Sequence, residues 1–150
     1  VATVCCKLFS QVTPDFAIFG EKDYQQLTVL KQMVRDLNLP LTIIGAPTRR
    51  EQDGLALSSR NAYLTPAERA VAPALHRAMQ TCATAIRSGT PIPEATAAAR
   101  AAVLAAGFKP VDYIAVRDAG TLAEPHADSP LRILAAAWLG KTRLIDNIPA

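Results

Sequence analysis

Residues 16–47, FAIFGEKDYQQLTVLKQMVRDLNLPLTIIGAP, predict a strand, a helix and a second strand in succession. The opening FAIFG is a short apolar run typical of a strand buried on both faces, and LTIIGAP has the same character. Between them, leucines and a valine recur at helical spacing, at Leu27, Leu30, Val34 and Leu37. This order predicts an α/β protein whose parallel strands are joined by a right-handed crossover.

A polar segment follows each of these strands. GEKDYQQ (20–26) comes directly after the first strand, and DGLALSSRN (53–61) comes after the second. Parallel sheets bind ligands outside the carboxyl ends of their strands, so we expect the two segments to lie side by side at one site. The second segment belongs to a long connection, EQDGLALSSRNAYLTPAER (51–69), whereas most such connections have about 2 to 6 residues and longer ones are often functional.

The rest of the chain has the pattern of a different unit. TPAE (65–68) predicts a capping box at the start of a long helix whose apolar stripe runs over 71–86. A second helix is expected over about 93–106, before a glycine. VDYIAV, LRILAAAWL and TRLIDNI then read as three strands, the last two joined by a tight hairpin. Two helices followed by three strands predict a small α+β unit.

Composition limits the class of protein. A chain of 150 residues, half of them hydrophobic, suits one ordinary domain or a small domain plus part of another. The net charge of +3 is too small to indicate nucleic acid, and no apolar run approaches the roughly 20 residues that span a membrane. The three cysteines, Cys5, Cys6 and Cys82, form no CxxC pair, so neither a disulfide framework nor a zinc site is expected. These features favour a soluble protein of the reducing cytoplasm.

The chain opens on VATVCCKLFSQV, an apolar pattern without an initiator Met. We therefore expect a fragment whose earlier half is absent.

The first polar segment offers an ammonium, a carboxylate and an amide at a helix start. If the helix begins near Glu21, its free amides and dipole favour an anion there. Lys22 could hold a phosphate, Asp23 could accept from ribose hydroxyls, and Gln26 could donate to a small carboxylate or hydroxyl. An ordinary exposed helix start carries similar residues, so spacing alone leaves both interpretations open.

The second segment is ambiguous in the same way. The hydroxyls of Ser58 and Ser59 and the five-donor fork of Arg60 could grip a polyphosphate. The flanking Asp53-Gly54 could be only a turn, and Asn61 only a local cap.

FGEKDYQQL (19–27) and DGLALSSRNAYLT (53–65) together resemble the pantothenate synthetase family, ATP-dependent ligases that join pantoate to β-alanine. The resemblance covers essentially the whole chain, the terminal RLIDN included, and matches the later half of such an enzyme. It implies that residues 1–62 end a parallel, Rossmann-like nucleotidyltransferase sheet. Residues 63–150 would form a C-terminal lid domain of two helices and a three-stranded antiparallel sheet.

The resemblance also assigns roles in the first segment. Gly20, Glu21, Lys22 and Asp23 would bind ATP, with Lys22 on phosphate and Asp23 and the Gly20 backbone near the ribose. Gln26 would hold pantoate.

In the second segment, Leu57, Ser58, Ser59 and Arg60 match a KMSKS-like signature, in which the serines and the arginine embrace the phosphates as a mobile clamp. Leu57 stands where many members have Met. Arg49 stands where an aliphatic residue is frequent, and its expected contact with adenine runs through the backbone. The residues implied to act in catalysis are Lys22, Ser58, Ser59 and Arg60.

The implied reaction has two steps. Pantoate attacks the α-phosphorus of Mg-ATP to give pantoyl adenylate and pyrophosphate, and β-alanine then displaces AMP. No carboxylate pair here is an evident metal site, so Mg²⁺ would be held mainly by the nucleotide. The parent enzyme is expected to be a homodimer with neither nucleic-acid nor membrane partners.

The family's HIGH-type histidine motif is absent from this chain. His76 falls within a predicted helix, which favours a structural or surface role, and His126 falls in a loop. The chain by itself is therefore expected to be inactive. Two alternatives stay open: another nucleotidyltransferase of the same superfamily, which would lack Gln26 and the order GEKDYQQ, or a non-catalytic lid-domain fragment.

Overall fold

The computed structural model describes residues 1–150, which form two compact units, Val1–Thr48 and Arg49–Ala150. The expected domain boundary after residue 62 lies further along the chain than this division. The difference arises because residues 49–57 pack with the second unit, where Leu55 belongs to the hydrophobic core. None of the helices combines the length and apolarity needed to cross a membrane.

The first unit contains the predicted strand, helix and strand, preceded by one more helix. Its elements are α1 (Ala2–Val12), β1 (Phe16–Gly20), the 3-10 helix η1 (Glu21–Asp23), α2 (Tyr24–Asp36) and β2 (Thr42–Ala46). The two strands are parallel, with Phe16 opposite Thr42 and Gly20 opposite Ala46. The predicted parallel pairing is therefore confirmed, and the carboxyl ends of both strands lie at the same edge.

The core of this unit lies on one face of the two strands. Its buried residues are Cys5, Phe9, Leu27, Leu30 and Ile43. The expectation that the first strand is buried on both faces is wrong for this chain, because Phe16 and Ile18 are 63% and 69% exposed. Ala17 and Phe19, which alternate with them, pack against the core. An apolar run shows that its residues favour burial. Successive side chains of a strand point to opposite faces of the sheet, however, and only one of these two faces is covered by the core.

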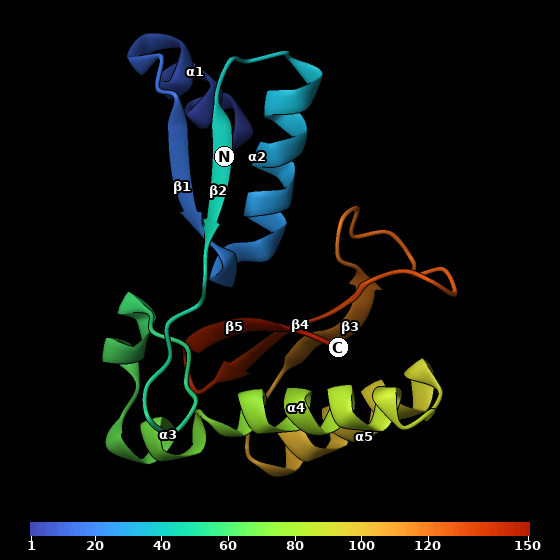
Figure 1. Ribbon diagram of the computed structural model, residues 1–150. Coiled ribbons are helices and arrows are strands. Elements are labelled where there is room, and N and C mark those ends of the chain that lie inside the picture. The colour runs from blue at the N-terminus through green and yellow to red at the C-terminus, as the bar shows by residue number, and fades with distance from the viewer. The chain divides into compact units, whose positions relative to one another are not determined.

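The second unit has helices on one face of an antiparallel sheet. Its elements are the 3-10 helix η2 (Ser59–Tyr63), α3 (Pro66–Val71), α4 (Ala74–Arg87), α5 (Ile92–Ala105), β3 (Val111–Asp118), β4 (Leu131–Leu139) and β5 (Thr142–Pro149). The strand order is β3-β4-β5 with both pairs antiparallel, which confirms the predicted separate sheet. Helices α4 and α5 lie side by side against this sheet (Figure 1).

The single long helix expected over residues 65–87 is instead two helices. The predicted capping box is present: Thr65 Oγ1 accepts from the Glu68 N–H at 3.3 Å, and the Thr65 N–H donates to Glu68 Oε2 at 2.8 Å. The first helix, however, ends at Val71, and the next begins after Pro73. Proline lacks the N–H that an unbroken helix would need at this position, so the unit has three helices where two were expected.

Candidate functional site

The first polar segment lies at the carboxyl end of β1, as predicted. Gly20 ends the strand, Glu21–Asp23 form η1, and Gln26 lies in the first turn of α2. The regular helix begins at Tyr24 and not near Glu21, so Lys22 lies in the tighter 3-10 turn before it. Lys22 and Gln26 are half-buried and Asp23 is exposed.

A glycine in β2 allows this segment to sit close to the end of the second strand. A Cβ at Gly45 would lie 3.0 Å from Leu27 Cδ2 and 3.3 Å from Glu21 Cγ, closer than side chains normally approach. A side chain at this point would require the side chains of Leu27 and Glu21 to shift by a few tenths of an ångström. The packing therefore places Glu21 beside the carboxyl end of β2 as well as next to β1.

The second polar segment begins as a small hairpin in the second unit. The Leu57 N–H donates to the Arg49 carbonyl at 2.9 Å, and the Glu51 N–H donates to the Leu55 carbonyl at 2.8 Å. At the tip, Asp53 Oδ1 accepts from the Leu55 N–H at 3.2 Å. This bond supports the interpretation of Asp53-Gly54 as a turn.

An ion pair between a half-buried arginine and a buried carboxylate anchors this hairpin to β5. The Arg50 guanidinium donates twice to Asp146, with Nη1–Oδ2 at 2.7 Å and Nη2–Oδ1 at 2.9 Å, and also donates to the Gly54 carbonyl at 3.1 Å. His76 Nδ1 lies 3.4 Å from Asp146 Oδ2. Burial by itself raises the pKa of Asp146, but the His76 imidazole and the Arg50 guanidinium outweigh it, and the pKa lies below its ordinary value. The buried position of His76 supports its structural interpretation.

A second, more exposed ion pair holds the tip of the hairpin. Arg69 Nη1 of α3 lies 2.6 Å from Asp53 Oδ2. The hydrogen bond from Arg69 lowers the pKa of Asp53. The hairpin is thus attached to α3 at its tip and to β5 at its base.

The serines and the arginine of the predicted clamp follow this hairpin directly. Ser58 caps η2 by accepting the Arg60 N–H at 3.2 Å, while Ser59 and Arg60 are exposed within that 3-10 turn. Asn61 Nδ2 donates to the Ala56 carbonyl at 3.0 Å, which supports its interpretation as a local hydrogen-bonding residue. The Arg60 guanidinium has no carboxylate partner within 4.0 Å. Its five donors are therefore available to an anion.

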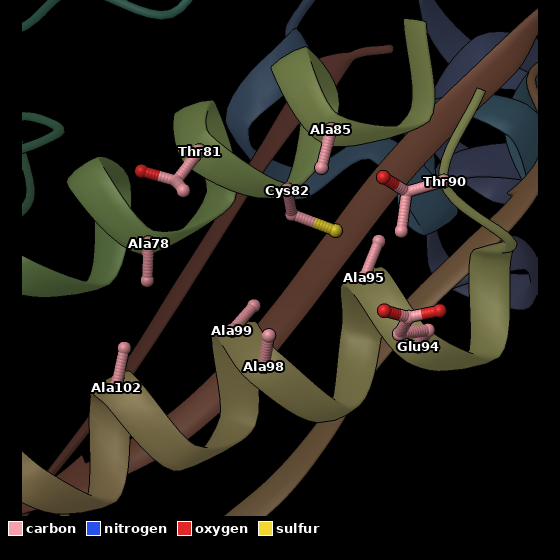
Figure 2. Close-up of a pocket in the computed structure, with 10 residues that line it drawn as sticks. All are labelled: Ala78, Thr81, Cys82, Ala85, Thr90, Glu94, Ala95, Ala98, Ala99 and Ala102. Carbon is pink, nitrogen blue, oxygen red and sulfur yellow. The ribbon is translucent and has the colours of Figure 1, made fainter. Parts of the chain in front are cut away.

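A groove between α4 and α5 has fewer side chains that could bind or react with a ligand than the two polar segments have (Figure 2). Its volume is about 170 Å³, and most of its lining side chains are alanines. Cys82 is its only thiol, and burial raises the pKa of that thiol, which disfavours the reactive thiolate. No cation lines this groove.

The predicted residues therefore form two local groups, one in each unit. Gly20–Gln26 lie at the strand ends of the first unit, and Arg49 is hydrogen-bonded to the Leu57–Arg60 segment of the second. The expectation that the two groups meet at one site stays a prediction. The anchor formed by Arg50 and Asp146 was not foreseen, because 96 positions separate the partners and neither has a local motif to mark it.

A family model and curated relatives match this chain over nearly its whole length. The model of the pantoate-beta-alanine ligase family matches residues 1–149. The pantothenate synthetases of Mesorhizobium japonicum and Caulobacter vibrioides are each 57% identical to this chain over 148 and 152 residues. These matches cover 99% of this chain and 52% and 53% of the two relatives. The chain therefore spans about half the length of the curated relatives it matches.

Solved structures show the same relationship. Pantothenate synthetase from Thermus thermophilus matches with a TM-score of 0.90 and 44% identity, over 98% of this chain and 54% of that protein. Pantoate-beta-alanine ligase from Francisella tularensis, solved in complex with beta-gamma ATP and beta-alanine, matches with a TM-score of 0.73 and 32% identity. That match covers 99% of this chain and 48% of the relative. On sequence and on structure, the chain belongs to the pantoate-beta-alanine ligase family.

Proposed function

We propose that the protein containing this chain condenses pantoate with β-alanine at the expense of ATP, through a pantoyl adenylate. The observation that carries the proposal is the family match over residues 1–149, with the two polar segments at the end of β1 and around η2. The Francisella relative, solved with beta-gamma ATP and beta-alanine, supports the same substrates. The resemblance also favours a cytoplasmic homodimer.

In this proposal the first unit binds nucleotide and pantoate. Lys22 contacts phosphate, the Gly20 backbone, Glu21 and Asp23 lie near the ribose, and Gln26 holds pantoate. The half-buried positions of Lys22 and Gln26 suit groups that contact a ligand while packing limits their freedom. Residues 1–62 would thus complete a nucleotide-binding domain, and residues 63–150 would form its lid.

The second unit supplies a phosphate clamp. Arg60 offers an unpaired guanidinium, and the exposed Ser59 and the capping Ser58 offer hydroxyls beside it. Leu57 and the backbone of Arg49 precede this clamp along the same hairpin.

The chemistry follows from the charges on the substrates. The pantoate carboxylate attacks the α-phosphorus of ATP, the bond to the bridging oxygen breaks, and negative charge moves onto the leaving pyrophosphate. The neutral amine of β-alanine then attacks the acyl carbon, AMP leaves with the bonding electron pair, and the amine proton is released. Lys22, Ser58, Ser59 and Arg60 act by positioning phosphates and by stabilising this developing charge, without a covalent enzyme intermediate.

The chain's own residues do not fit a resident metal site. No group of three or more His, Cys, Asp or Glu side chains could hold a metal ion. In the proposal Mg²⁺ would arrive with the nucleotide and would help to neutralise its negative charge.

The decisive experiment compares two lysines of the first unit in the longer protein. We expect Lys22→Ala to slow adenylate formation by roughly 100- to 1000-fold, since a preorganised charge donor acts mostly in the transition state. Lys31→Ala, further along α2, should change the rate little. Single-turnover formation of pantoyl adenylate measures the step directly.

A Lys22→Ala rate within about threefold of the wild type is incompatible with this role, because an ordinary solvated lysine predicts small effects at both positions. In the same assay the 150-residue chain by itself should release no AMP. AMP release by this chain that needs both pantoate and β-alanine would instead show that it is a complete catalyst.

A further inference from the structure

A buried carboxylate of β5 contacts both the hairpin of residues 49–57 and the helix α4. Asp146 accepts both hydrogen bonds of the Arg50 fork, at 2.7 and 2.9 Å. Its Oδ2 also lies 3.4 Å from Nδ1 of His76, which is itself buried. We call Arg50, His76 and Asp146 the anchor cluster. It joins the hairpin, a helix and a strand within the second unit.

The imidazole of His76 also packs against the hairpin directly. A Cβ at Gly54 would lie 2.9 Å from His76 Cδ2, so the ring is in close contact with the backbone of this glycine. The Gly54 carbonyl in turn accepts from Arg50 Nη1 at 3.1 Å. The turn of the hairpin is therefore fixed by an imidazole and by a guanidinium of the same cluster.

Backbone and side-chain hydrogen bonds connect this hairpin to the turn that follows it. The Leu57 N–H donates to the Arg49 carbonyl at 2.9 Å, and residues 58–60 come directly after Leu57. Asn61 Nδ2 donates to the Ala56 carbonyl at 3.0 Å, which ties η2 back to the hairpin. A change in the position of the hairpin should therefore displace residues 58–60 as well.

The ion pair suits the placement of a segment better than a general contribution to stability. Removing a carboxylate from water costs free energy, so such a pair adds little stability over apolar residues of the same volume. Two parallel hydrogen bonds between a guanidinium and a carboxylate, however, fix both distance and orientation. The anchor cluster therefore defines where the hairpin lies on β5 and α4.

We propose that Asp146 and His76 are positioning residues for adenylate formation, because they orient residues 58–60 through the hairpin. The inference rests on the proposed function for the identity of the reaction. Neither side chain needs to contact a substrate. A displacement of about 1 Å, caused by a substitution far from the chemistry, can cost roughly 100-fold in rate.

Asp146→Asn in the longer protein tests the role of the carboxylate, since it removes the charge and keeps the shape of the side chain. We expect single-turnover formation of pantoyl adenylate to slow by about 10- to 100-fold. The reaction of supplied pantoyl adenylate with β-alanine should change by no more than about threefold, because pyrophosphate has already left at that step. Circular dichroism and the thermal midpoint establish that the variant is folded at the assay temperature.

His76→Phe is a second variant, which tests the proposal even if Asp146→Asn does not fold. It keeps a ring beside Gly54 but loses the nitrogen that faces Asp146. Adenylate formation should slow by about three- to tenfold. An unchanged rate in a folded His76→Phe protein would overturn the role of His76.

Val103→Ala is the matched control for loss of stability. Val103 of α5 is fully buried and lies outside the anchor cluster, so its truncation opens a cavity in the core of the same unit. The variant should have a lower thermal midpoint but form adenylate within about twofold of the wild-type rate. A loss of rate as large as that of Asp146→Asn would overturn the proposal, because general destabilisation would then explain both.

A double-mutant cycle with Arg60 tests whether Asp146 acts through the turn. In an Arg60→Ala background, Asp146→Asn should slow adenylate formation by no more than about threefold further, because the group that it positions is already absent. Equal losses in the two backgrounds would overturn the proposal. A folded Asp146→Asn protein with a rate within about twofold of the wild type would overturn it as well.

Hydrogen exchange of the 150-residue chain gives a readout that needs no activity. In Asp146→Asn, the amides of residues 49–63 should exchange about tenfold faster relative to those of α5, and Val103→Ala should not show this local change. The two proposals fail separately. Adenylate formation that both anchor variants leave unchanged would remove the positioning role and keep the proposed function. The local change in exchange, without adenylate formation by the wild type, would remove the proposed function and leave the control of residues 58–60 by the cluster.

Discussion

Position 140 shows how one residue can connect two parts of the second unit. Gly140 adopts a left-handed φ of 57°, and its missing side chain makes room for the Glu68 carboxylate. We expect Gly140→Ala to lower the free energy of unfolding by about 2 to 4 kcal/mol, from backbone strain together with displacement of the capping box. Urea denaturation measures the change.

Gly89→Ala provides the matched control. Gly89 also has a positive φ, 92°, but a Cβ there would meet nothing within 4 Å. Its substitution should therefore cost only the strain, about 1 to 2 kcal/mol. Equal losses in the two variants would show that contact with Glu68 adds nothing to the requirement for glycine at 140.

Contacts between individual residues also show which parts of the fold and of the candidate site could be predicted from the sequence. The capping box of Thr65 and Glu68 and the turn at Asp53 were predictable because their partners lie within three residues of each other. Arg50 and Asp146 are 96 positions apart, so their pairing depends on the tertiary fold. No local sequence pattern predicts it. For the same reason, the sequence singled out Arg60 but not Lys141, although both line one surface hollow of the second unit.

Among the secondary-structure elements, every predicted strand is present. The wrong predictions concern the continuity of the helix after Thr65 and the burial of β1. The apolar stripe of residues 71–86 continues through the break at Pro73. The periodic pattern depends on side chains, whereas the break results from the backbone N–H that proline lacks. Similarly, the composition of β1 indicated an apolar strand but not which faces other elements cover, and Ile18 is exposed. Periodicity therefore predicts the type of an element better than its length or surroundings.

The capping box makes a testable contribution to the short helix α3. Thr65→Ala removes the oxygen that accepts the Glu68 N–H, and we expect it to lower the free energy of unfolding by about 1 kcal/mol. Thr81→Ala is the control, since Thr81 is exposed within α4 and its hydroxyl donates only to the Arg77 carbonyl. Alanine has the higher helix propensity at such a site, so this variant should be neutral or slightly more stable. A loss in Thr81→Ala as large as that in Thr65→Ala would contradict the assignment of the effect to the cap.

For the molecule as a whole, the second unit joins helices, a sheet and the hairpin before η2 around one core. Its core includes Leu55 from the hairpin before η2, and the Arg50–Asp146 pair fixes that hairpin to β5. The predicted phosphate clamp therefore follows a hairpin that is anchored to the core and the sheet of this unit. Precise positioning of catalytic groups requires such support from packed neighbours.

This anchor should make the stability of the second unit sensitive to acid. The folded state holds the pKa of Asp146 below its ordinary value of 3.8, so the stabilising effect of its ionised form is fully present above about pH 4. That effect is lost as the pH falls through the lowered pKa, because the carboxyl group then takes up a proton and its pairing with Arg50 weakens.

Asp146→Asn tests this linkage. At pH 7 the variant should be less stable by about 3 to 5 kcal/mol, because it leaves the Arg50 guanidinium without its charge partner. The difference from the wild type should shrink when urea unfolding is repeated below pH 4. Asp112→Asn, which breaks the more exposed pair with Arg143, should cost no more than about 1 kcal/mol at pH 7. A difference between Asp146→Asn and the wild type that stays constant from pH 7 to pH 3 would show that Asp146 stabilises the fold through packing and not through its charge.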